Sequence, residues 1–184
     1  MTADALFKGL AAVLEARGRK STDRGEQIST LMKLYEGAQT PYQRIRVLLT
    51  LVAARFDYST LASTHMPIDM WKQARDELTT LIKLLLENMS YLVLEETDDY
   101  DDQVERKPNE NGEGEFVPVR GSVVSFIDRL EDEFTKSLQN TDPHATEYVE
   151  RLCDEKLLYQ TIVLGQGYFE TVLAQQLPEK MALM

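Results

Sequence analysis

Apolar residues recur along most of the chain at intervals of three and four positions, the spacing that places side chains on one face of an α-helix. Pro67 opens one such stripe, which includes Trp71 as an expected core residue and ends near Asn88. Thr40 and Pro41 mark another helix start, because threonine caps a first turn and proline suits the first helical position. The same pattern predicts helices over about 4–17, 23–35, 41–56, 67–88 and 122–138.

A sixth helix is expected to begin at the sequence Asn140-Thr141-Asp142-Pro143. Its apolar stripe includes Tyr148, Leu152, Tyr159 and Val163, and Gly165 and Gly167 either end it or lie within a longer helix that stops at Pro178. Residues 91–94 and 116–120 are extended or frayed, without a convincing strand. The pattern therefore predicts an all-α fold of six or seven amphipathic helices, packed as antiparallel pairs in a helical-repeat or solenoid-like array.

Acidic residues are concentrated between positions 95 and 115, where ten acids stand against two bases. That segment carries −8 of the net charge of −11 and has too few apolar residues to order itself. We expect three regions: helical pairs over 1–94, a disordered acidic loop over 95–115, and a helical pair over 116–184 that continues the array. The loop is either a solvated linker or a tether for a basic partner.

Several chemistries are excluded by composition. One cysteine and two histidines rule out an internal disulfide, a cysteine-based metal site and a three-histidine site, and no phosphate-binding loop occurs. We therefore expect no cofactor. Cys153 is expected to pack as a small apolar residue, and the acidic run 131–133 to form a solvated face with Lys136 paired to Asp132. No export signal or membrane span is present, which predicts a location in the cytosol or the nucleus without membrane binding.

The strongest basic cluster surrounds the turn between the first two expected helices. It is a candidate contact for RNA or a protein partner, because phosphates and carboxylates both bind guanidinium groups. A cation at a helix C-terminus is also favourable without any ligand. The cluster consists of Arg17, Arg19, Lys20 and Arg24.

A second candidate region lies at the start of the sixth expected helix. Its polar residues suit helix capping or a protein contact. An alternative is an enzyme that uses His144 with nearby carboxylates, which would require a pocket and a second positioned group. The residues concerned are Thr141, Asp142, His144, Glu147 and Tyr148.

Three stretches carry a family resemblance. Residues 121–155, which include the run from Thr141 to Val149, resemble the c subunit of eukaryotic translation initiation factor 3. Residues 16–58 and 66–71 fit the same family, so the resemblance covers nearly the whole chain in order. It places this chain in the helical-repeat region that precedes the carboxy-terminal PCI domain of a longer protein.

The resemblance implies a non-enzymatic scaffold in the cytoplasm. It implies binding to the small ribosomal subunit and its rRNA, assembly of the 43S pre-initiation complex, and contacts with other initiation factors. Other subunits of the complex are implied partners, notably the a subunit through regions outside this chain. The alternative is a helical-repeat subunit of another PCI-type assembly, such as the proteasome lid or a signalosome.

Overall fold

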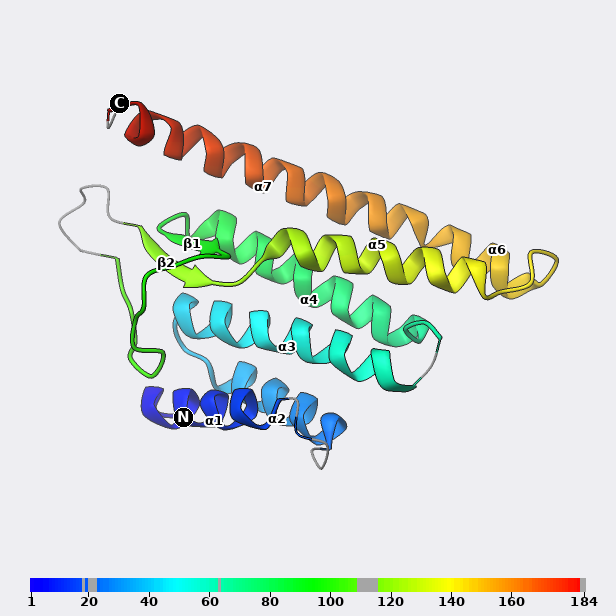
Figure 1. Ribbon diagram of the computed structural model, residues 1–184, viewed down its shortest axis with the longest axis horizontal. Coiled ribbons are helices and arrows are strands. Elements are labelled where there is room, and N and C mark those ends of the chain that lie inside the picture. The colour runs from blue at the N-terminus through cyan, green and yellow to red at the C-terminus, as the bar shows by residue number, and fades with distance from the viewer. Residues whose placement is uncertain (18, 20–22, 63, 109–115, 183–184) are drawn as a thin grey trace.

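The computed structural model describes residues 1–17, 19, 23–62, 64–108 and 116–182. Within those residues the chain is mostly helical, which confirms the all-α class (Figure 1). Two four-residue strands form a small sheet between the fourth and fifth helices. The elements are α1 (Ala3–Ala16), α2 (Arg24–Gly37), α3 (Pro41–Ala62), α4 (Ile68–Glu87), β1 (Tyr91–Leu94), β2 (Val117–Arg120), α5 (Val123–Gln139), α6 (Thr146–Cys153) and α7 (Glu155–Ala182).

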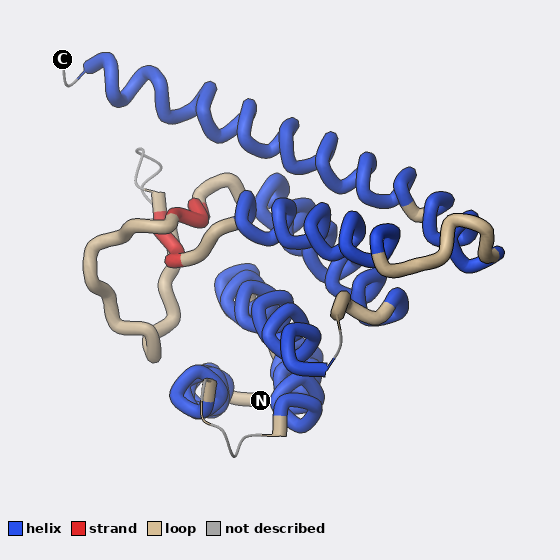
Figure 2. Tube along the Cα trace, turned by 45° about the vertical axis from the view of Figure 1, so that its right-hand side comes forward, coloured by secondary structure: helices blue, strands red, loops and turns tan. Residues whose placement is uncertain are grey.

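The helices form a layered stack from α1 and α2 at one side to α7 at the other (Figure 1). The colour sequence shows that α3, α4, α5 and α7 alternate in direction, as expected for antiparallel neighbours joined by short links. α3 packs against both α2 and α4, and α7 packs against both α4 and α5. The C-terminal part of α7 extends beyond the helices below it in both views (Figures 1 and 2).

Two of the helix starts follow the predicted caps. The Asp23 carboxylate accepts hydrogen bonds from the backbone N–H groups of Gly25 at 2.9 Å and Glu26 at 3.2 Å. The Thr40 hydroxyl accepts from the N–H of Gln43 at 3.2 Å. These bonds satisfy donors that have no partner inside the first turn, so local sequence fixes both starts.

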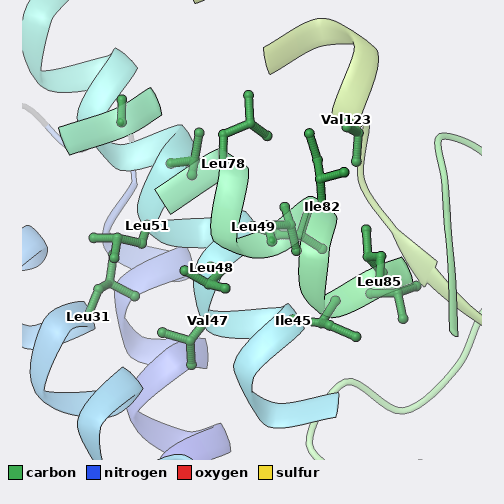
Figure 3. Close-up of a cluster of buried hydrophobic side chains, with 14 of the residues drawn as sticks. Leu31, Ile45, Val47, Leu48, Leu49, Leu51, Leu78, Ile82, Leu85 and Val123 are labelled. Atoms are coloured by element: carbon green, nitrogen blue, oxygen red, sulfur yellow. The ribbon is translucent and has the colours of Figure 1, made fainter. Parts of the chain in front are cut away.

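One continuous apolar core runs through the stack. α3 lies at its centre, and nearly every residue from Tyr42 to Phe56 is buried. Figure 3 shows side chains of α2, α3, α4 and α5 meeting there, including Leu31, Leu48, Leu78, Ile82 and Val123. Trp71 is fully buried, as predicted. Because α3 is buried nearly all round, it is a core helix rather than an amphipathic one.

The strands differ from the expectation of an all-helical chain without strands. β1 and β2 pair in parallel, with Tyr91 opposite Val117 and Leu94 opposite Arg120. Parallel strands cannot be joined by a tight turn, so the chain must travel back before it enters β2. The acidic segment makes this return, which gives its length a structural reason. β2 lies at the edge of a two-stranded sheet, where Pro118 is tolerated.

The acidic segment also differs from the predicted disorder over residues 95–108. The Glu105 carboxylate accepts hydrogen bonds from Thr40 at 2.5 Å and from Gln43 at 2.7 Å. The Tyr100 hydroxyl accepts from the backbone N–H of Arg120 at 2.9 Å. Hydrogen bonds to Thr40, Gln43 and Arg120 thus hold this part of the segment, which has few apolar residues to pack. The rest of the predicted loop, 109–115, lies outside the described residues.

The sixth helix begins later and the last one ends later than predicted. α6 starts at Thr146 behind Ala145, so His144 lies in the preceding turn rather than in the first helical turn. α7 continues through Gly165 and Gly167 and past Pro178 to Ala182. A proline removes one backbone donor, and only four residues of helix follow it. Cys153 is exposed, which contradicts its expected packing.

Candidate interaction surfaces

The predicted basic cluster is partly used inside the fold. Arg17 donates from Nε to the Asp57 carboxylate at 2.7 Å, and Arg24 donates from Nη1 to the Asp57 carbonyl oxygen. Asp57 lies on α3, so both arginines tie the α1–α2 turn to the core helix. Arg19 is exposed, and Lys20 lies outside the described residues. Arg17 and Arg24 therefore anchor the turn, whereas Arg19 is exposed.

The turn between α5 and α6 contains the second predicted group. The Thr141 hydroxyl donates to the Ser137 carbonyl oxygen at 2.7 Å, at the end of α5. The Asp142 carboxylate accepts from the backbone N–H of His144 at 2.9 Å, which closes a local turn. The side chains of His144 and Glu147 are exposed, and Tyr148 is half-buried. These residues form a polar corner at one end of the stack.

The buried face of α6 and α7 is not the apolar stripe that the sequence suggested. Asp154 keeps right-handed helical dihedral angles (φ −74°, ψ −11°), so α7 follows α6 with little break. The buried positions recur at intervals of three and four, as on one helix face. They are Arg151, Asp154, Leu158, Thr161, Gly165 and Tyr168.

The contacts of Arg151 explain why a charged residue occupies a central position on that buried face. Its guanidinium carbon lies 4.3 Å from the Trp71 ring centroid and 4.8 Å from that of Phe134. It donates to the Ser137 hydroxyl at 2.8 Å and to the Asp154 carboxylate at 3.0 Å. Burial lowers the pKa of Arg151, and Asp154 opposes that shift. Stacking and the ion pair together let α5, α6 and α4 meet around a cation.

The opposite face of α6 and α7 carries large apolar side chains in contact with solvent. We call this set the outer face. Tyr159 is 67% exposed and Val149 is 58% exposed, values far above those of core residues. The four positions share one side of the helix by their spacing. They are Val149, Leu152, Tyr159 and Val163. The sequence pattern included Leu152, Tyr159 and Val163 in an apolar stripe, but with Tyr148 in place of Val149 and with the expectation that the stripe packs against another helix.

Glu133 is a further residue that the sequence analysis placed wrongly. The expected solvated face includes it, yet it is buried. Its carboxylate accepts a hydrogen bond from the backbone N–H of Met66 at 2.7 Å, and Lys136 lies 3.4 Å away. Glu133 thus holds the start of α4 against α5. Lys136 pairs with it rather than with Asp132.

A cleft of about 400 Å³ opens between α1, α3, α5 and the acidic segment. We call it the arginine cleft, because Arg17, Arg46, Arg120 and Arg129 line it. Leu49 and Phe126 are among its apolar residues. His144 is not part of its lining, so the predicted catalytic alternative gains no pocket here. Among the described residues no group of three or more metal-ligating side chains occurs.

No helix in the described ranges is both long enough and apolar enough to cross a membrane.

Comparisons with known proteins give the family. A profile of the family "Eukaryotic translation initiation factor 3 subunit 8 N-terminus" matches residues 1–184. A protein from Mycosarcoma maydis, named as the C subunit of eukaryotic translation initiation factor 3, is 62% identical over 92% of this chain and 19% of its own length. Proteins of the same name from Pyricularia oryzae and Aspergillus fumigatus are 48% and 47% identical over 92% of the chain.

The chain spans about a fifth of the length of these relatives. The resemblance that residues 16–58, 66–71 and 121–155 carry is therefore confirmed by matches along almost the whole chain. The alternative families, a proteasome-lid or signalosome subunit, receive no support from these matches. The chain belongs to the family of the c subunit of eukaryotic translation initiation factor 3.

Proposed function

We propose that this chain is a non-catalytic scaffold segment of translation initiation factor 3. In this proposal it acts in the cytoplasm, supports binding of the complex to the small ribosomal subunit, and contributes to assembly of the 43S pre-initiation complex. Other subunits of the factor, including the a subunit through regions outside this chain, are its partners. The names of the relatives support the assignment to this complex.

The observation that carries the scaffold proposal is the outer face of α6 and α7. Its four apolar side chains gain nothing from exposure to water, and their burial against a partner would be favourable. The face is rigid, because the opposite side of the same helices is anchored by Arg151 and Leu158. We assign it to a protein contact within the initiation-factor complex.

The basic turn and the α5–α6 corner are proposed secondary contacts. Arg19 and Lys20 are assigned to rRNA or an acidic protein surface, and Arg17 and Arg24 to holding the turn on Asp57. A polar rim beside the outer face is assigned to residues of the α5–α6 turn and the first turn of α6, namely Thr141, Asp142, His144, Glu147 and Tyr148.

The scaffold proposal is tested by purification of the tagged full-length protein from cytosol. The test variant combines Val149→Glu, Tyr159→Glu and Val163→Glu, which places charge on the outer face. We expect initiation-factor subunits to copurify with the wild type and to be reduced at least about tenfold with the variant. Val124→Glu is the matched control, since Val124 is exposed and lies on α5. Equal recovery with all variants would contradict the proposal.

The basic turn is tested separately by sedimentation with small ribosomal subunits. Arg19→Glu with Lys20→Glu should weaken association more at low salt than at high salt, because salt already screens this interaction. Arg17 and Arg24 stay unchanged, since reversing them would disturb the contact with Asp57. Equal sedimentation at low salt would remove the turn from the proposed ribosome contact.

A further inference from the structure

The arginine cleft has a charge opposite to that of the molecule as a whole. Four arginines and one aspartate, Asp102, line it, so its lining carries a formal charge of +3, whereas the chain carries −11. Two further carboxylates, Asp57 and Asp99, pair with Arg17 and Arg120, so the cleft together with these partners carries +1. The cleft is therefore cationic within an acidic protein. Its volume of about 400 Å³ falls in the range that holds a small ligand or a few side chains.

Two of these arginines already bind carboxylates of the acidic segment. Arg46, whose side chain is 8% exposed, lies 3.3 Å from the Asp102 carboxylate and also donates to the Tyr42 hydroxyl at 2.9 Å. Arg120 lies 3.4 Å from the carboxylate of Asp99. Asp99 and Asp102 are themselves largely exposed. The arginines of the cleft thus already bind carboxylates, and those carboxylates are in contact with water.

Arg129 adds a further cation to the lining of the cleft. Its guanidinium carbon lies 4.6 Å from the Phe56 ring centroid, a cation–π contact that holds the group without neutralising its charge. A planar guanidinium held in this way presents paired donors that suit a carboxylate. Leu49 and Phe126 lie nearby and offer an apolar surface.

This combination suits a short acidic peptide better than a nucleic acid. An extended phosphate backbone would pass the acidic segment, with Asp99, Asp101 and Asp102 along it, and would meet repulsion from a chain of net charge −11. A peptide needs only local charge, and its apolar side chain can use Leu49 and Phe126. The geometry points to an acidic peptide segment of a partner protein as the occupant of the arginine cleft, with its carboxylates on Arg120 and Arg129 and its apolar side chain against Phe126.

The acidic segment then competes with the peptide for the cleft. Asp99 pairs with Arg120 in the free protein, and Asp102 lines the cleft on Arg46. An incoming carboxylate therefore displaces Asp99 from Arg120 and meets the negative charge of Asp102. The site lies on a different part of the stack from the outer face of α6 and α7, and it goes beyond the proposed scaffold function. Its failure would leave that function untouched.

Fluorescence anisotropy on the full-length protein tests the inference. The probe is a labelled eight-residue peptide of Asp and Glu with one central Leu, and its matched control replaces the acids by Asn and Gln. Arg120→Glu and Arg129→Glu should each weaken binding of the acidic probe about tenfold or more. Arg44→Glu is the matched control variant, because Arg44 is an exposed arginine of α3 outside the cleft.

Asp102→Asn distinguishes an effect on binding from a folding defect, because a folding defect can only lower the affinity for the probe. Removal of the Asp102 charge should instead strengthen probe binding several-fold. Unchanged affinity in Arg120→Glu, Arg129→Glu and Asp102→Asn would overturn the inference, as would an equal loss in Arg44→Glu. A single-stranded RNA of the same charge that binds more tightly than the peptide, and loses affinity in the same variants, would replace the peptide by a nucleic acid and also overturn it.

Discussion

Arg55 on α3 binds the carboxylate of Glu77 on α4 through two hydrogen bonds, from Nε and from Nη2, each of 2.6 Å. Both side chains are largely buried, with exposures of 6% and 18%. Such a bidentate pair fixes the relative rotation of two helices as well as their separation. It joins the central helix of the stack to the helix that carries Trp71.

Glu77→Ala should lower the free energy of unfolding by about 3 kcal/mol, because it leaves the Arg55 guanidinium buried with a reduced set of partners. Urea denaturation measures this change. Glu87→Ala, at an exposed position of the same helix, should change the free energy by less than about 0.5 kcal/mol. Similar small changes in both variants would show that the pair contributes little.

Glu133→Ala should destabilise the chain by about 2 kcal/mol, since it leaves the buried N–H of Met66 without an acceptor. Glu133→Gln keeps a carbonyl oxygen in place and should cost less. Thermal or urea unfolding compares the two, with the exposed Glu131→Ala as control. Equal losses in the Ala and Gln variants would mean that the hydrogen bond to Met66 is not the source of the effect.

The two glycines of α7 should respond differently to alanine. Nothing lies within 4 Å of a Cβ at Gly167, so Gly167→Ala should stabilise the helix by about 0.8 kcal/mol. A Cβ at Gly165 would collide with Cδ1 of Ile127 on α5, and that side chain must move. Gly165→Ala should therefore gain about 1 kcal/mol less than Gly167→Ala.

Ile127→Val supplies the control for this comparison, because it removes the Cδ1 atom. In that background Gly165→Ala should recover most of the gain seen at Gly167. Equal stabilisation by the two alanine variants in the unmodified chain would contradict the close approach of α7 to α5.

Stability should fall when the pH rises above 10. Burial raises the pKa values of Tyr42, Tyr91 and Tyr168 above the ordinary value of 10.0. The unfolded chain releases these protons first, so the folded state binds more protons in this range and its stability is lost as pH rises through the folded pKa values. Phenolate absorbance should show Tyr42, Tyr91 and Tyr168 titrating above pH 10 in the folded chain. Titration of these three at the ordinary value would contradict this assignment.

Local signals gave the starts of α2 and α3, whereas long-range contacts decided the features that local signals do not encode. Asp23 and Thr40 bond to the turns directly after them, so their roles are visible in the sequence. The pairing of β1 with β2 depends on residues separated by the acidic segment, and four-residue strands carry too little pattern to be recognised.

The buried face of α6 and α7 shows a second limit of the sequence pattern. Its contacts use Arg151 and Thr161, which an apolar pattern omits, while Tyr159 and Val163 satisfy the pattern on the outer face. Of the predicted contact residues, Arg17 and Arg24 lie together at Asp57, and the group from Thr141 to Tyr148 lies at one corner. The arginine cleft was missed because its arginines come from four separate segments.

The most direct test of the scaffold account is a site-specific cross-link from the outer face. A photoreactive phenylalanine analogue at position 159 of the full-length protein, irradiated in the purified complex, reports what covers that side chain. The account predicts a cross-link to a protein of the initiation-factor complex, and none from the same analogue at position 124 on α5. Absence of any protein cross-link from position 159 would contradict the account.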